Sequence, residues 1–214
     1  MQHIGAVCPP RPYRKGEQIY RLGEPAGTLY VLLEGHVKLS RPGHLGADRV
    51  LNVCGPDDFF GESFLTPSAV TLSDAICLTE QAVVCPINRA QFLEIVRLRP
   101  GVAVLLSSIL ASRLQELQAR LDALGQPVQA RLAQVMLDLA YRLGREVEPD
   151  VYELHVELRH EEIASLAQAS RVSATQAISA WRQQEFVVGT RGRYRVNTTA
   201  LEQLIEQLQL EALE

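Results

Sequence analysis

The chain has 214 residues, of which 47% are hydrophobic and 21% charged, and its formal net charge is −4. This composition excludes a disordered chain, and the length is enough for two modules that each bury a core. The longest apolar run, residues 102–111, contains serines and is too short to cross a bilayer, and the N-terminus lacks the order of a secretion signal. We therefore expect a cytoplasmic protein with no membrane segment.

All the cysteines precede residue 86, and they form no CxxC pair and have no neighbouring histidine cluster: Cys8, Cys54, Cys77 and Cys85. Buried thiols in strands are the simplest interpretation. A structural disulfide would be out of place in a reducing compartment, and an iron–sulfur cluster needs four thiolates around one site. We expect neither a cofactor nor a metal ion.

Residues 13–86 consist of short apolar runs that are rich in strand-forming residues and are separated by glycine-containing turns. Several strands at this spacing predict a small barrel or sandwich. Within the region, Gly61, Glu62 and Ser63 offer a flexible turn, a carboxylate and a hydroxyl, yet no Lys or Arg occurs in residues 57–78. The segment resembles an anion-binding pocket in which the binding cation is missing.

The character of the sequence changes after Asn88, a candidate N-cap for a short helix that ends at Pro100. A long helix is predicted over 102–125, another over 128–143, and a loop over 144–152. In the long helix, leucines recur in a heptad pattern: Leu110, Leu114, Leu117, Leu121 and Leu124. This seam is either an intramolecular core face or an interchain coiled coil, and its polar flanks favour the coiled coil of a two-fold homodimer.

Residues 158–187 indicate two short helices joined by a tight turn, a helix-turn-helix, followed by a hairpin with its turn at 189–192 as a wing. The second helix is expected to bury Ala174, Ala177, Ile178 and Trp181. Although the whole chain is acidic, residues 155–197 hold six arginines against four acids, so one face can be basic. A helix pair that only packs is the alternative.

The start of a helix in the DNA major groove can reach base edges. Arg171 can pair with a guanine, Gln176 with an adenine, and Val172 can touch a thymine methyl. The candidate DNA contacts are Ser170, Arg171, Val172, Ser173, Thr175 and Gln176, with His160 before them and Arg191 and Arg193 on the wing. No metal-ligand histidine pair, Ser-His-Asp order or phosphate-binding glycine loop stands out, so we do not expect an enzyme. A protein-binding adaptor that has abandoned DNA is a third possibility, which the arginines count against.

Three segments in this order resemble the cyclic-AMP receptor protein and FNR family of bacterial transcription regulators: "YRKGEQIYRLGEPAGTLYVLLEGHVKLS", "GPDDFFGES" and "EEIASLAQASRVSATQAISAW". The resemblance implies an α+β chain with a cyclic-nucleotide-binding-like β-roll (a double-stranded β-helix or jelly roll) in residues 1–100, a dimerisation helix in 101–126 and a winged helix-turn-helix in 127–214. It also implies a homodimer that reads a palindromic operator in double-stranded DNA, often as an activator that recruits RNA polymerase.

The chain departs from this family in the candidate effector pocket. Where cyclic-AMP-binding members have an Arg-Ser pair for the cyclic phosphate, this chain has Leu72 and Ser73, and a Thr-Ser pair that meets the base is replaced by Leu117 and Gln118. A phosphate that loses a charge-assisted hydrogen bond loses about 1.5 to 3 kcal/mol of binding free energy. We therefore expect a regulator that does not depend on cyclic AMP. The alternatives are a pocket that uses another cation, such as Arg113, for a cyclic nucleotide or another small ligand, and a Glu62 that only caps a turn.

Overall fold

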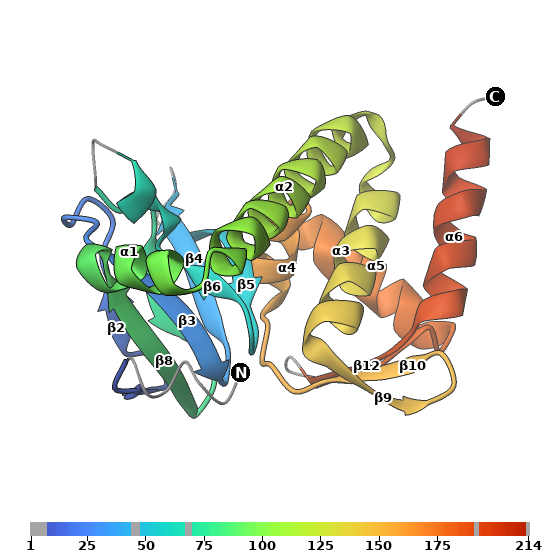
Figure 1. Ribbon diagram of the computed structural model, residues 1–214. Helices are drawn as coiled ribbons and strands as arrows, with labels where there is room; N and C mark the ends of the chain where they lie inside the picture. The colour runs from blue at the N-terminus through green and yellow to red at the C-terminus, as the bar shows by residue number, and fades with distance from the viewer. Residues whose placement is uncertain (1–7, 44–47, 67–69, 191–192, 213–214) are drawn as a thin grey trace. The chain divides into compact units, whose positions relative to one another are not determined.

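The computed structural model describes residues 8–43, 48–66, 70–190 and 193–212. The chain divides into two compact units, Met1–Ala119 and Arg120–Glu214. Strands dominate the first unit until two helices close it, and the second unit combines helices with a small sheet (Figure 1). This order of elements confirms the predicted α+β fold.

The first unit is built on two antiparallel four-stranded sheets, in the orders β1-β8-β3-β6 and β2-β7-β4-β5. Their short strands follow the predicted apolar runs and turns. The strands are β1 (Arg11–Arg14), β2 (Gln18–Tyr20), β3 (Thr28–Glu34), β4 (Val37–Pro42), β5 (Asp48–Cys54), β6 (Phe59–Phe60), β7 (Asp74–Cys77) and β8 (Gln81–Asn88). A single 3-10 turn, η1 (Glu62–Leu65), follows β6.

The two sheets face one another across an apolar core to which both contribute, including Leu32 of β3 and Val37 of β4. The turn between these two strands depends on Gly35, whose φ is 78°. A Cβ atom there would lie 2.2 Å from the Gln81 carbonyl oxygen, so only glycine fits. The close return of β3 into β4 therefore places consecutive strands in different sheets.

Two helices end the first unit, α1 (Arg89–Leu98) and α2 (Gly101–Asp122). The predicted cap is confirmed, because the Asn88 side chain accepts a hydrogen bond from the Gln91 backbone N–H at 2.9 Å and the Gln91 side chain accepts one from the Asn88 backbone N–H. Leu106 of α2 is buried, and Ile109 and Leu110 pack beside it on the β-roll. The helices thus cover the end of the β-roll that carries η1.

The cysteines correct one expectation. Cys8 and Cys85 form a disulfide with their Cα atoms 5.7 Å apart, a separation that a disulfide accommodates. The prediction of separate thiols is wrong for this pair, because the fold returns β8 beside a segment 77 residues earlier. Cys54 and Cys77 are buried and are not joined by a disulfide within the described part of the chain, as expected.

The described residues of the second unit form four main helices, a short 3-10 turn and one four-stranded antiparallel sheet in the order β11-β12-β10-β9. Its buried centre includes Met136, Ile178 and Trp181. The elements are η2 (Ala123–Gly125), α3 (Val128–Leu143), β9 (Gly144–Glu148), β10 (Val151–Leu154), α4 (His160–Leu166), α5 (Arg171–Gln183), β11 (Val187–Thr190), β12 (Arg193–Asn197) and α6 (Thr198–Glu211).

The predicted helix over 128–143 agrees with α3, whereas the predicted loop over 144–152 is wrong. That segment forms the β9–β10 hairpin, which turns through Asp150 at a φ of 62°. Its second strand, β10, pairs with β12, more than forty residues later, as in Val151 opposite Asn197. A partner so distant leaves no local signal in the sequence.

Candidate nucleic-acid interface and effector pocket

The helix-turn-helix is formed by α4 and α5, as predicted. The turn bends at Gln168, whose φ is 50°, and the Ala169 N–H donates to the Ala164 carbonyl at 2.8 Å. Ser170 then caps α5 by accepting from the Ser173 N–H at 3.0 Å. These local hydrogen bonds fix where α5 begins.

Arg131 of α3 binds the backbone carbonyls of this turn, a contact that the sequence did not predict. Its guanidinium donates to the carbonyls of Ala167 at 3.1 Å and Gln168 at 3.3 Å, and also to that of Gln126 at 2.8 Å. A cation satisfies the carbonyls left open at the end of α4. No periodic pattern links Arg131 to residues thirty-six positions later.

One face of α5 is buried and the opposite face is exposed. The predicted apolar side is confirmed, since Ala174, Ala177, Ile178 and Trp181 are all buried. Arg171, Val172, Thr175 and Gln176 lie together on the exposed side, and Val172 is 65% exposed. Ser170 is exposed at the cap, and Ser173 is half-buried. Helical periodicity therefore gathers the candidate DNA contacts on one surface.

The hydroxyls on this surface are partly used within the protein. The Oγ atoms of Ser170 and Ser173 lie 2.8 Å apart and share a hydrogen bond. The Thr175 hydroxyl donates to the Arg171 carbonyl at 2.9 Å. Among the described residues, the Arg171 guanidinium has no hydrogen-bond partner, so it is the side chain most available to a guanine.

His160 begins α4 beside this surface. Its Nδ1 atom lies 3.0 Å from the Thr175 Oγ1 atom of α5. Partial burial, together with the nearby guanidiniums of Arg182 and Arg171, lowers the pKa of the imidazole. His160 is therefore neutral at pH 7 in the free protein.

The wing is the β11–β12 hairpin, with Val188 paired to Arg195. Arg193 is exposed at the start of β12, while Arg195 lies 3.9 Å from the Glu153 carboxylate. Arg191, the other predicted wing contact, lies outside the described residues. Of the two arginines predicted on the wing, Arg193 is thus the one that lies within the described residues.

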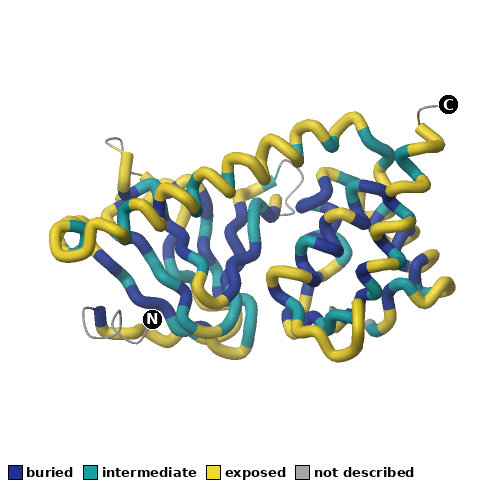
Figure 2. Tube along the Cα trace, turned by 45° about the vertical axis from the view of Figure 1, so that its right-hand side comes forward, coloured by how far each residue is buried: buried dark blue, intermediate teal, exposed yellow. Residues whose placement is uncertain are grey.

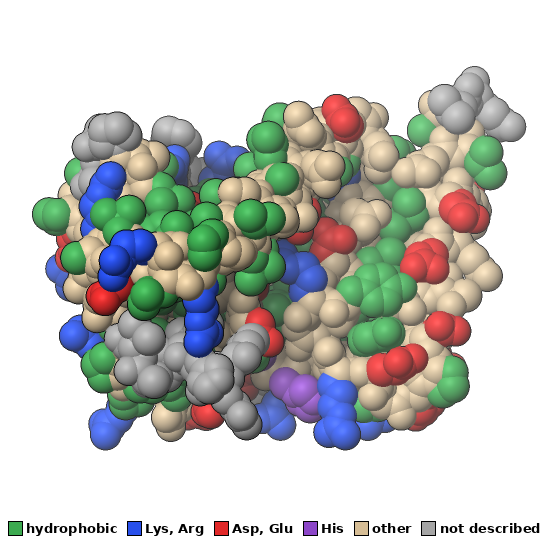
Figure 3. All heavy atoms as spheres, viewed as in Figure 1, with side chains coloured by type: hydrophobic (Ala, Val, Ile, Leu, Met, Phe, Trp, Pro, Cys, Tyr) green, Lys and Arg blue, Asp and Glu red, His purple; other side chains and the backbone are tan. Residues whose placement is uncertain are grey.

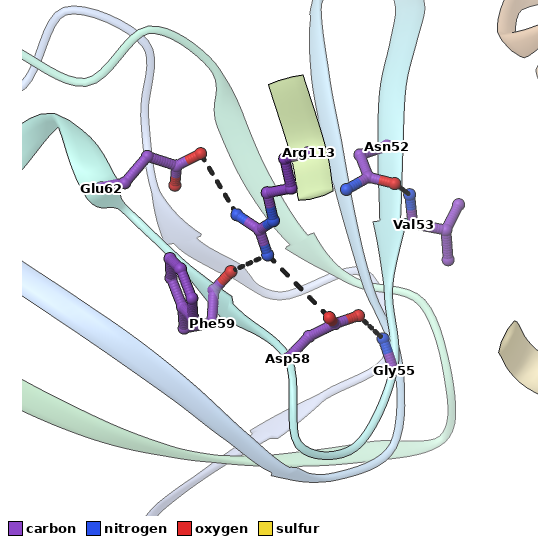
Figure 4. A network of polar contacts seen from close by, with 7 residues as sticks. All are labelled: Asn52, Val53, Gly55, Asp58, Phe59, Glu62 and Arg113. Atoms are coloured by element: carbon purple, nitrogen blue, oxygen red, sulfur yellow. Dashed lines mark hydrogen bonds and ion pairs between the residues drawn. The ribbon is translucent and has the colours of Figure 1, made fainter. Parts of the chain in front are cut away.

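The candidate effector pocket brings Arg113 of α2 against Glu62 of η1, 51 residues apart, with 3.3 Å between guanidinium and carboxylate (Figure 4). The same guanidinium donates to the Phe59 carbonyl, lies 3.9 Å from the Asp58 carboxylate and stacks 4.4 Å from the centre of the Phe59 ring. The idea that Glu62 only caps a turn is wrong, since η1 has no side-chain cap and the carboxylate binds Arg113. The Arg113 charge is therefore balanced by the protein's own acids.

The other pocket candidates are arranged differently. Gly61 has a φ of 82° and leads into η1, which also carries Ser63. Ser73 is buried and hydrogen-bonds Tyr20, a phenol whose pKa is raised by burial. Leu72 is 57% exposed, and its carbonyl accepts a hydrogen bond from Arg41 of β4. On α2, Leu117 and Gln118 are both exposed.

Comparisons with known proteins agree with this geometry. Residues 10–99 match the cyclic nucleotide-binding domain and residues 130–206 the Crp-like helix-turn-helix domain. The chain is 31% identical over 171 residues to a CRP-like cAMP-activated global transcriptional regulator of Mycobacterium tuberculosis, covering 79% of this chain and 75% of the relative. The chain belongs to the CRP/FNR family of transcription regulators.

Further CRP/FNR relatives support the same assignment. The cyclic AMP receptor protein of Thermus thermophilus is 30% identical over 89% of this chain and 85% of its own. The structure of FixK2 from Bradyrhizobium japonicum shares the fold, with a TM-score of 0.76 and 22% identity over 92% of this chain and 96% of that one. This CRP/FNR chain is therefore a DNA-binding transcription regulator, and α5 is the second helix of its helix-turn-helix.

The described residues contain no group of three or more His, Cys, Asp or Glu side chains placed to hold a metal ion. They also contain no single helix with the length and apolar character to cross a membrane, although Arg89–Leu98 and Gly101–Gly125 together have that length and character, with a bend of 114° between them.

Proposed function

We propose that this regulator acts as a cytoplasmic homodimer on a palindromic operator, as an activator, without requiring cyclic AMP. The observation that carries the proposal is the exposed face of α5, where Arg171 and Gln176 stand free beside Val172. Two such helices related by a two-fold axis would enter successive major grooves about 34 Å apart. The division into a sensor at 1–100, a dimerisation helix at 101–126 and a DNA-binding domain at 127–214 belongs to the same proposal.

The leucine seam supports dimerisation. Leu114, Leu117 and Leu121 are 57%, 56% and 62% exposed, and Leu124 is 44% exposed just after the helix. Figure 2 shows most of α2 in yellow. So many leucines exposed in heptad spacing favour an interchain coiled coil, since a second copy would remove them from water. Leu110 is the exception, because it packs partly on the β-roll.

The pocket supports independence from cyclic AMP. A cyclic phosphate bound beside the exposed Leu72 would gain no cation from that position. Arg113, the nearest alternative, is held by Glu62 and Asp58, and a phosphate would have to compete with those carboxylates. The protein's own ion pairs thus occupy the charge that an anionic effector needs.

A cyclic-nucleotide-dependent regulator is the second candidate, favoured by one contact. The Arg41 guanidinium donates to the Leu72 carbonyl, so β4 brings a cation to the segment that lacks one. The relatives described as cAMP-activated favour the same alternative. In that case Arg41 would hold the phosphate.

Two experiments test these proposals. Selection of bound duplexes from a random pool, with and without cell extract, should yield a palindrome in both conditions; a palindrome only with extract would indicate a diffusible effector. Titration calorimetry with cyclic AMP and cyclic GMP should detect no binding. Micromolar binding that is lost in Arg41→Ala would replace the first candidate with the second.

Activation is tested on the selected operator. In transcription reactions with purified RNA polymerase, the regulator should raise transcript yield when the operator lies upstream of the promoter. A decrease at every operator position would make the protein a repressor.

A further inference from the structure

We propose that His160 is a proton-coupled contact to the DNA backbone, which takes up a proton as a phosphate approaches, so that DNA binding strengthens as the pH falls. The inference rests on the DNA-binding role of α5. It gives His160 and Thr175 the role of coupling proton uptake to DNA binding.

The hydrogen bonds around Thr175 fix the tautomer of His160. The Thr175 hydroxyl has one proton, and it donates that proton to the Arg171 carbonyl at 2.9 Å, an oxygen that can only accept. In the hydrogen bond of 3.0 Å between His160 Nδ1 and Thr175 Oγ1, the imidazole N–H must then be the donor. Neutral His160 therefore carries its proton on Nδ1 and a lone pair on Nε2.

This tautomer prevents a neutral His160 from binding phosphate. His160 is half-buried, and its Nε2 atom forms no hydrogen bond with the described residues. A lone pair can only accept, and a DNA phosphate oxygen also only accepts, so the two repel. A proton added at Nε2 creates both a donor and a positive charge, the features that phosphate contacts use.

The environment of His160 favours this protonation only when DNA is bound. Arg171 and Arg182 approach His160 from α5, and Arg182 lies over the Tyr194 ring at 5.8 Å. Beside His160, Arg159 is paired at 2.6 Å with Glu161 and at 3.4 Å with the buried Glu162, one cation against two carboxylates, and none of these three is among the groups that shift the pKa of His160. Partial burial and the guanidiniums of Arg182 and Arg171 disfavour imidazolium in the free protein, and a phosphate that neutralises these guanidiniums reverses the preference.

The position of His160 favours backbone over base. It precedes α5 in the chain and contacts that helix through Thr175, one turn after Arg171, on the exposed side. A side chain on the first helix of a helix-turn-helix lies where that helix crosses the sugar-phosphate backbone. Proton uptake should therefore accompany binding to any duplex, whatever its sequence.

The test measures binding of the full chain to a labelled random-sequence duplex of about 30 base pairs, by fluorescence anisotropy at fixed ionic strength. Between about pH 8 and about pH 6, the wild-type affinity should rise roughly three- to tenfold. His160→Gln should lose this rise, and His160→Arg should bind tightly at every pH. His155→Gln, which changes another histidine of the same unit, is the matched control and should keep the wild-type profile.

Thr175→Val separates a tautomer effect from a merely structural one. Without the Thr175 acceptor, the proton of neutral His160 can move to Nε2 and be donated to phosphate. The variant should then bind more tightly than wild type at about pH 8 and show a flatter pH profile. A profile that is the same as that of the wild type would overturn the role of Thr175.

Calorimetry in buffers of different ionisation enthalpy counts the protons directly. Wild type should take up protons on binding, and His160→Gln should take up fewer. Proton release, or equal uptake by both, overturns the inference while leaving DNA binding intact. A wild-type chain that binds no duplex at any pH would instead overturn the DNA-binding assignment together with the inference.

Discussion

The Arg113 guanidinium of α2 contacts the Glu62 carboxylate at 3.3 Å and the Phe59 ring at 4.4 Å, which ties the long helix to the end of the β-roll. The Arg113 side chain is only 17% exposed. The guanidinium is therefore paired with a carboxylate of the protein itself. Arg113 thus adds a polar contact between α2 and the β-roll to the apolar contacts of Leu106, Ile109 and Leu110.

Arg113→Ala should loosen this connection. The substitution removes the cation–π contact and two charge-assisted hydrogen bonds, to the Phe59 carbonyl and to the partly exposed Glu62 carboxylate, and the second bond is weakened by solvent. The local free energy of opening should fall by about 2 to 4 kcal/mol. Hydrogen exchange of residues 58–65 should accelerate accordingly. Gln118→Ala, an exposed change on the same helix, should leave the exchange unchanged; equal acceleration in both would show that any truncation of α2 has this effect.

Gly61→Ala should destabilise the β-roll more than Gly23→Ala does. Both glycines have positive φ angles, 82° and 84°, so each substitution carries strain of about 1 kcal/mol. Only at Gly61 would the new Cβ atom meet backbone, at 2.8 Å from the Thr28 carbonyl oxygen. The extra loss, about 1 kcal/mol or more, should be measurable by hydrogen exchange of β3. Equal losses would mean that the β3–η1 contact yields easily.

Leu121→Asp should produce monomers if the leucine seam joins two chains. A charge at a seam position is unfavourable in a coiled-coil core. Leu105→Asp is the control, because Leu105 is 61% exposed, like Leu121 at 62%, but lies off the heptad.

Figure 3 shows that hydrophobic side chains also gather over α1 and the start of α2, where Leu93, Leu98, Val104 and Leu105 are exposed. Sedimentation velocity should find monomers for the first variant and dimers for the second; the reverse would move the interface to this second patch.

Arg171→Ala should weaken binding to the selected operator by about 1 to 3 kcal/mol and leave binding to random duplexes nearly unchanged. The reason is that a bidentate guanine contact contributes only at the right base. Gln183→Ala, exposed at the far end of α5, is the control and should bind like wild type. An equal loss on both kinds of duplex would show that Arg171 contacts phosphate.

The lowered pKa of His160 also predicts a pH dependence of stability. Because the folded pKa lies below 6.5, the unfolded chain binds more protons between the two values, so the free energy of unfolding falls as pH drops through that window. Urea unfolding can be followed by the fluorescence of Trp181, the chain's one tryptophan and a buried residue of α5. His160→Gln should show a smaller loss below about pH 6.5, and His155→Gln the full loss. Identical slopes in all three proteins would contradict the assignment.

Local patterns in the sequence determined the elements that depend on neighbouring residues. The Asn88 cap, the helix over 128–143 and the buried face of α5 follow from capping and helical periodicity, which act within a few residues. The exposed leucines in α2 and the absence of a cation from residues 57–78 were likewise readable without a structure.

Tertiary structure alone decided which distant residues meet. The Arg113–Glu62 pair, the Arg131 contacts with the turn, the Cys8–Cys85 disulfide and the β9–β10 hairpin paired to β12 all join segments far apart in the chain. Such contacts depend on loop closure and on the surface that each side chain faces after folding, and neither has a periodic signature. The tautomer of His160 is of the same kind, because it depends on a threonine fifteen residues away whose hydroxyl proton is already donated.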